Sequence, residues 1–277
     1  MLLPESNPRR VFTVTPRAYV ARMPKRSSHP AGTPSYIDIG SPDPDATAAF
    51  YGELFGWTVN DLGPDAGGYR MAQIDGDDVA GIGPAQNPGP PYWCTYITVD
   101  NVDDTTKKVE AAGGSVLAPA MDVMEAGRMA VFMDPNSAVF SVWQPNQSIG
   151  SARVNEHGTL CWNELNTRNF GVAKKFYSEV FGWGWTDNPE YGEFKVGDKV
   201  VGGVMPMTPD RFPPEVPENW LVYFAVDDID AAVKKIDALG GKLMMEPFEA
   251  GGVGKMVVAG DPQGAAFAII QMEQPGE

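Results

Sequence analysis

Ala46–Trp57 reads ATAAFYGELFGW, and Val172–Trp183 reads VAKKFYSEVFGW. The shared FY and FGW letters align at a constant offset of 126 residues. A second block, Val99–Gly114 (VDNVDDTTKKVEAAGG), matches Val226–Gly241 (VDDIDAAVKKIDALGG) at an offset of 127. Solenoid repeats have periods of about 20–50 residues, so a period this long indicates a duplicated domain.

The duplication divides the 277 residues into two units. We expect domain 1 over residues 32–144, a linker over 145–157 and domain 2 over 158–272. Residues 1–31 have no clean hydrophobic periodicity, which predicts a disordered or loosely packed N-terminal extension. Each half is long enough to bury a core of its own.

Composition limits the partners and the location. The 36 acidic and 21 basic residues give a formal net charge of −15, which disfavours nucleic acid as a partner. No apolar run reaches the roughly 18 residues that span a membrane. The two cysteines, Cys94 and Cys161, fall one per half in apolar runs, as expected of buried thiols in a reducing cytoplasm. We therefore expect a cytoplasmic protein that is a monomer or a weak homodimer and takes a small-molecule ligand.

Within each half, a strand, a helix and further strands occur twice in succession. The first helix begins at Asp43 and Pro44, which suit the cap and first helical position, and Gly56 suits its end. Because strands outnumber helices, we expect an α+β fold of two βαβββ modules per domain. The modules should pair into a curved, partly closed sheet with helices outside. The concave inner face is where a small ligand would lie.

These motifs resemble a known group of proteins. A strand, a helix ending in FYxxLFGW, a VDDVD…GG block and a late DPxG are typical of the vicinal oxygen chelate superfamily. That superfamily includes glyoxalase I, extradiol dioxygenases, and bleomycin- and fosfomycin-resistance proteins. The resemblance covers residues 32–144 and 158–271, and the starts GTPxYxDI and GTLxWNEL resemble twin-domain actinobacterial members. It implies a glyoxalase-like lyase or a pathway hydroxylase, and a divalent metal as cofactor.

The resemblance also places the metal ligands, which in the family are His, Gln and Glu. Counting from the FY, VD and DP motifs gives Tyr36, Cys94, Ser141 and a site near Gly81-Ile82 in domain 1. The matching positions of domain 2 are Trp162, Leu221, Ala268 and Gly203-Val204. A divalent transition metal requires several imidazole, carboxylate or thiolate ligands, and one cysteine cannot supply them. We therefore predict no metal and no other cofactor.

Strand alternation predicts which side chains share the concave face. If Tyr36 and Cys94 face inward, Asp38 and Tyr96 do too; Trp162 and Leu221 likewise bring Glu164 and Tyr223. A carboxyl group in an apolar cavity has a raised pKa and can act as a general base, with a phenol as donor to an oxyanion. Asp38, Glu164, Tyr96 and Tyr223 are the catalytic candidates. Mutual hydrogen bonding without a function, or ligand binding alone, would also explain each pair.

Seven further residues are candidate ligand contacts: Tyr36, Cys94, Ser141, Trp143, Trp162, Arg128 and Lys255. Arg128 and Lys255 hold matched places and suit either an anionic ligand or a solvated rim. Trp143 suits either the cavity lining or the core. Two functions remain open from the residues, beside an interaction or antigenic role of the surface, of which the sequence gives no sign. One is metal-independent acid/base chemistry on a small metabolite; the alternative is a non-catalytic binder that sequesters a hydrophobic or aromatic metabolite or antibiotic.

Overall fold

The computed structural model describes residues 24–86, 89–186, 188 and 190–273. The first half contains β1 (Pro34–Ser41), α1 (Pro44–Phe55), β2 (Thr58–Asp61), β3 (Arg70–Ile74), β4 (Asp77–Pro84), β5 (Tyr92–Thr98), α2 (Val102–Ala111), β6 (Ser115–Val123), β7 (Gly127–Met133) and β8 (Val139–Pro145). The second half contains β9 (Leu160–Thr167), α3 (Phe170–Phe181), β10 (Gly184–Thr186), β11 (Gly192–Val196), β12 (Lys199–Pro206), β13 (Asn219–Ala225), α4 (Ile229–Ala238), β14 (Lys242–Leu243), β15 (Phe248–Ala250), β16 (Gly254–Gly260) and β17 (Ala266–Met272).

Each half forms one mixed sheet. The strand order of the first is β2-β3-β4-β1-β5-β8-β7-β6, and the second follows β10-β11-β12-β9-β13-β17-β16-β14 with β15 beside β16. The first strands of the two modules meet in the middle, where β1 pairs antiparallel with β5 and β9 with β13. The α+β fold with two βαβββ modules in each half is confirmed.

The first helix of each half forms for local reasons. The Asp43 carboxylate accepts a hydrogen bond from Ala46 N, Pro44 holds the first position of α1, and Gly56 ends the helix at φ 75°. In α3, Asn169 caps Val172 N and Gly182 ends the helix at φ 71°. The repeated FGW motif is thus a glycine stop followed by a tryptophan.

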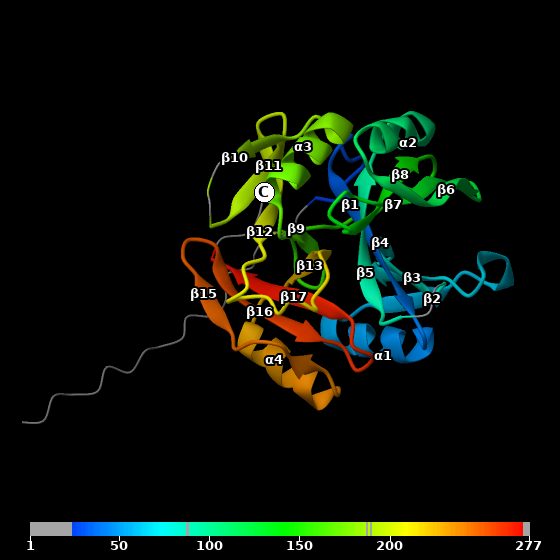
Figure 1. The fold of residues 1–277 in the computed structure, drawn as a ribbon. Coiled ribbons are helices and arrows are strands. Elements are labelled where there is room, and N and C mark those ends of the chain that lie inside the picture. The colour runs from blue at the N-terminus through cyan, green and yellow to red at the C-terminus, as the bar shows by residue number, and fades with distance from the viewer. Residues whose placement is uncertain (1–23, 87–88, 187, 189, 274–277) are drawn as a thin grey trace, which may run out of the picture.

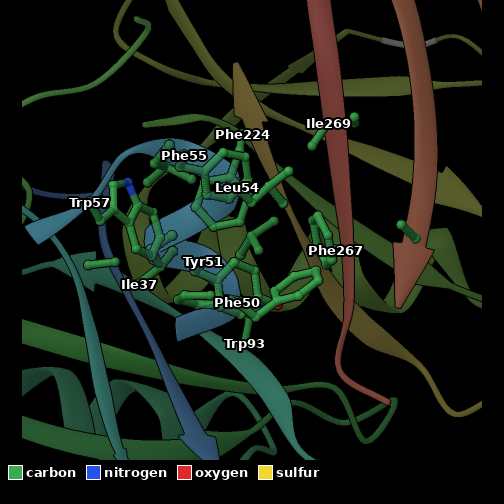
Figure 2. Packing of buried hydrophobic residues seen from close by; sticks show 14 of the residues in the cluster. Ile37, Phe50, Tyr51, Leu54, Phe55, Trp57, Trp93, Phe224, Phe267 and Ile269 are labelled. Carbon is green, nitrogen blue, oxygen red and sulfur yellow. The ribbon is translucent and has the colours of Figure 1, made fainter. Parts of the chain in front are cut away.

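The two halves share their cores, contrary to the expectation that each half buries its own. One core joins the first module to the fourth, so that Figure 2 shows Phe224 and Phe267 of the second half beside Tyr51 and Phe55 of α1. The other core joins α2 and its strands to α3 and its strands. In Figure 1, α1 lies near α4 and α2 near α3. Buried residues of both halves line each core, so the convex face of one half is buried against the other.

The repeated motifs make these contacts reciprocally. Tyr51 of α1 donates to the Asp261 carboxylate across the halves at 3.3 Å, and Tyr177 of α3 donates to Asp134 at 3.0 Å. The two tryptophans of the FGW motifs behave in the same way: Trp57 Nε1 donates to Gly158 O at 2.7 Å, and Trp183 Nε1 to Gly32 O at 2.8 Å. The FY, FGW, GT and DP motifs therefore form the contacts between the two halves, which we call the joint.

Part of the predicted extension packs on the linker. Arg26 N donates to Ala152 O at 2.8 Å, and His29 Nε2 lies 2.8 Å from Ser151 O. Residues 1–23 of the extension lie outside the described residues. Within the part of the chain that the structure describes, no helix is long and apolar enough to cross a membrane.

Candidate functional site

The concave face of domain 1 carries a chain of hydrogen bonds that ends on Asp38. Its Oδ2 accepts from Tyr96 OH at 2.9 Å and from Tyr69 OH at 3.1 Å. The Tyr36 hydroxyl lies 2.9 Å from that of Tyr69. Because Tyr69 gives its only proton to the carboxylate, Tyr36 is the donor in that contact. The register places β1 and β5 side by side here, with Tyr36 opposite Tyr96 and Asp38 opposite Cys94.

The same arrangement occurs in domain 2. Glu164 has the phenols of Tyr223 and Tyr191 as hydrogen-bond partners, and Trp162 Nε1 donates to Tyr191 OH at 2.8 Å. The chains therefore run Tyr36 to Tyr69 to Asp38, and Trp162 to Tyr191 to Glu164. We call each set of four residues the carboxylate–phenol cluster of its domain. The direction of proton donation is the same in both clusters although the outer donor and the acid differ.

Burial sets the acidity of the two carboxyl groups. Desolvation raises the pKa of Asp38 to about 6, against the opposing hydrogen bonds from Tyr96 and Tyr69. Desolvation raises the pKa of Glu164 to about 7, against Tyr223 and Tyr191. Asp38 is partly exposed, whereas Glu164 is 4% exposed. Both groups therefore exchange protons near neutral pH, as a general base requires.

Tyr69 and Tyr191 were missed by sequence reasoning. Each directly precedes the second strand after a helix, β3 or β11, and lies over a glycine of the next strand. A Cβ added to Gly81 would lie 1.8 Å from Tyr69 OH, and one added to Gly203 would lie 1.9 Å from Tyr191 OH. The available signal was this coincidence, in both halves, of a tyrosine before the strand and a glycine at the position implied for a metal ligand.

The remaining candidates of domain 1 surround its cluster. Cys94 Sγ lies 3.1 Å from Ser141 Oγ, and burial raises the pKa of the thiol. Trp143 packs in the same concave cluster as Tyr36 and Tyr96, and its Nε1 donates to Ser148 O at 2.9 Å. Apolar side chains take these places in domain 2, whose concave cluster includes Leu221, Ala268 and Ile270. The two faces thus differ most around the clusters.

Arg128 and Lys255 are not brought to the clusters. Arg128 Nη1 lies 3.2 Å from Asp103 Oδ2 in α2, and Lys255 Nζ lies 2.6 Å from Asp230 Oδ1 in α4. Both helices pack on the convex side, and the next residue of each strand, Met129 or Met256, belongs to the concave cluster. These geometries match a solvated ion pair and offer nothing toward a ligand in the concave face.

The concave faces do not fit a divalent metal. The implied ligand positions hold a phenol, a thiol, a hydroxyl and a glycine in domain 1, and the space above the glycine is filled by Tyr69. In domain 2 they hold an indole, two aliphatic side chains and a glycine. Among the described residues there is no group of three or more His, Cys, Asp or Glu side chains that could hold a metal ion.

Comparison with known proteins places the chain. It is 43% identical over 263 residues to the "Putative glyoxylase CFP32" of Mycobacterium bovis, covering 90% of this chain and 98% of the relative. It is 36% identical to the "Anthracycline biosynthesis protein DnrV" of Streptomyces peucetius, covering 88% and 94%.

Solved structures share the fold. The 2,3-dioxygenase LapB from Pseudomonas sp. KL28 matches with a TM-score of 0.64 at 15% identity, over 89% of this chain and 95% of that one. The Mn(II)-bound glyoxalase from Novosphingobium aromaticivorans matches with a TM-score of 0.61 at 17% identity, over 89% and 86%. The sequence profile of the Glyoxalase/Bleomycin resistance protein/Dioxygenase superfamily matches residues 33–141 and again residues 159–269. The chain therefore belongs to that superfamily, with one family domain in each half.

Proposed function

We propose that the protein binds a small hydroxylated aromatic metabolite in its concave faces and transfers a proton to or from it without a metal. The observation that carries this proposal is the carboxylate–phenol cluster, built twice from matched positions. The acid has changed between the halves and the surrounding side chains have changed more, yet the order of donor, phenol and carboxylate is the same.

The side chains around the domain 1 cluster favour an aromatic ligand. Trp143, Met71 and Met129 lie in or against the concave cluster of Tyr36 and Tyr96. Aromatic and thioether groups pack well on flat rings, and thioethers adapt to irregular shapes. The relative named for anthracycline biosynthesis makes an aromatic metabolite a reasonable class to test first.

The chemistry follows from the groups present. The ionised Asp38 accepts a proton from a C–H bond next to a ligand carbonyl, whose electrons move onto the carbonyl oxygen as an enolate. The phenols of Tyr69 and Tyr96 then turn from the newly protonated acid to that oxygen and stabilise its charge by hydrogen bonding. Return of the proton to carbon, or to another atom of the ligand, restores Asp38. Glu164, Tyr191 and Tyr223 provide the same groups in domain 2.

A specific observation favours the alternative, a non-catalytic binder. Asp38 already accepts two hydrogen bonds from phenols, so its cluster is satisfied without a ligand. In that case the cluster would be a rigid polar surface on which a sequestered aromatic ligand packs.

Deuterium exchange separates the two functions. Hydroxylated aryl ketones are incubated with the protein in D₂O, and loss of the proton next to the carbonyl is followed by NMR, with binding measured by calorimetry. We expect exchange that falls at least 100-fold in the double variant D38N/E164Q, because a general base contributes about 10²–10⁴-fold. Lys255→Ala, on the convex side, is the matched control and should leave the rate unchanged.

Three results would decide against proton transfer without a metal. Binding without exchange supports the binder. Exchange that survives in D38N/E164Q shows that the carboxylates are not the base. Stoichiometric Zn, Ni or Mn in the purified protein, with exchange lost on chelation and restored by the metal, overturns metal independence.

A further inference from the structure

Among the described residues of domain 2, one buried side-chain oxygen has no hydrogen-bond partner. Asn166 lies on β9 two residues beyond Glu164, so both side chains emerge on the concave face. Its side chain is 3% exposed, and its Oδ1 makes no hydrogen bond. A buried amide oxygen without a partner costs free energy, so native proteins rarely leave one empty without a reason.

The direction of the amide is fixed by its neighbours. Asn219 Nδ2 donates to Pro217 O at 2.9 Å, which leaves Asn219 Oδ1 as an acceptor. Asn166 Nδ2 donates to that oxygen at 3.1 Å. Reversing the Asn166 amide would place two oxygens against each other, so Oδ1 is the atom turned away from the pair.

We propose that Asn166 Oδ1 is a hydrogen-bond acceptor subsite that binds a second hydroxyl or amide N–H of the ligand held at Glu164. The inference rests on the proposed function, because it assumes that a ligand occupies the concave face of domain 2. Met205 is the β12 partner of Asn166 and lies beside it in the sheet, and its sulfur accepts a contact from Arg211 Nη1 at 3.6 Å.

At the matching place in the described part of domain 1, no side chain offers such an acceptor. The positions that match Asn166 and Met205 are Gly40 and Gly83, which pair with each other between β1 and β4. Glycine presents no side-chain polar group. The polar side chains of β1 on the concave face therefore end at Asp38, whereas those of β9 continue from Glu164 to Asn166. The two domains should therefore prefer different ligands, with the longer, two-donor ligand in domain 2.

The spacing of the two side chains sets the size of that ligand. Residues two apart on a strand are separated by roughly 6–7 Å. Hydroxyls on adjacent carbons of one ring are too close to reach both groups. A flat two-ring compound with hydroxyls at opposite ends matches the span, and so does a hydroxyl opposite an amide N–H.

Two naphthols test the subsite. 2-Naphthol and 2,6-dihydroxynaphthalene have the same ring system and differ by the second hydroxyl, and their affinities are measured by calorimetry. We expect the diol to bind about five- to tenfold more tightly, which is the net effect of one hydrogen bond to a buried acceptor. Asn166→Ala and Asn166→Leu should remove this preference and keep 2-naphthol binding. The leucine variant matters because it fills the space and admits no water that could replace the amide.

Gly40→Ala is the matched control in domain 1. An added Cβ there meets Ala85 Cα at 3.6 Å, an ordinary contact, so this variant should retain the diol preference. Equal affinities of the two naphthols for the parent protein would overturn the subsite, and so would a preference for the diol that survives in both Asn166 variants. If Glu164→Gln still weakens the binding of 2-naphthol, the proposed function stands and only the subsite is wrong. If neither naphthol binds at either domain, the proposed aromatic ligand class is wrong and the subsite falls with it.

Discussion

The two halves make the same contacts on their convex faces and different ones on their concave faces. On the convex side, Tyr51 and Tyr177 hold equivalent carboxylates across the joint, and Trp57 and Trp183 hold equivalent carbonyls. On the concave side, a thiol and a hydroxyl in domain 1 are replaced by aliphatic groups in domain 2, and a glycine is replaced by Asn166.

The reason for the difference is geometric. A convex residue of one half packs against the other half, so a change in one motif must suit its partner motif. A concave residue packs mainly within its own sheet and can change alone. The motifs that reveal the duplication are therefore the ones that form the contacts between the halves. The ligand preferences of the two domains depend instead on the concave side chains that differ.

The largest expected effect comes from separating the halves. Residues 24–157 expressed alone expose half of each shared core, so we expect no folded monomer. The fragment should form a dimer or aggregate, as seen by light scattering, and should lack cooperative thermal unfolding as a monomer. The reciprocal fragment from residue 158 should behave in the same way.

The control keeps the joint and removes only the covalent link. Coexpression of the two fragments leaves every contact between the halves available, and we expect them to copurify as a folded pair. A monomeric fragment 24–157 with a cooperative transition near that of the whole chain would contradict the shared-core description.

The sequence predicts the fold of each half, but it does not predict the contacts between the halves. The offset of 126 residues and the caps at Asp43 and Gly56 predict two αβ units and their helices. They do not say that Tyr51 finds Asp261, 210 residues away. Helical periodicity marks an apolar stripe without saying which surface covers it. The expectation of two separate cores failed for that reason.

The candidate site was predicted in part. Strand alternation was enough to place Asp38 with Tyr96 and Glu164 with Tyr223. Tyr69 and Tyr191 precede their strands, and their reach depends on the register of β3 and β11 against Gly81 and Gly203, which no local pattern encodes. Asn166 shares a face with Glu164, but its unpaired oxygen is visible only once the neighbouring amides are placed.

Ionisation of the two concave carboxyl groups, Asp38 and Glu164, should lower the free energy of unfolding by different amounts. The pKa of Glu164 is raised from 4.5 to about 7, so the folded state holds a proton that the unfolded state releases between these values. Stability is therefore lost as the pH rises through this window. Glu164→Gln avoids the loss, and we expect it to be more stable than the parent by roughly 2–3 kcal/mol at pH 8 and equal below pH 4.

Asp38→Asn should show a smaller gain, with its window between pH 3.8 and about 6, because Asp38 is partly exposed. Chemical denaturation at pH 4, 6 and 8 measures both variants. A gain at pH 8 that is larger for Asp38→Asn, or a loss for both, would reverse the assignment of Glu164 as the more desolvated acid.

The smallest expected effect concerns the reciprocal tyrosines. Tyr51→Phe removes the donor to Asp261 and leaves Trp93 Nε1, which donates to the same hydroxyl at 2.9 Å, without its acceptor. Tyr177→Phe does the same to Asp134 and Trp220. Each should cost about 1–2 kcal/mol, in the lower part of the roughly 1–3 kcal/mol that an unsatisfied buried donor or acceptor costs.

If the joint is symmetric in energy as it is in geometry, the two costs should agree within about 0.5 kcal/mol, as measured by urea unfolding. Tyr92→Phe, on a ring that is 52% exposed, is the control and should be neutral. Unequal costs would show that one core dominates the joint. In that case the half of the chain whose tyrosine matters less would be the one free to move when a ligand enters its concave face.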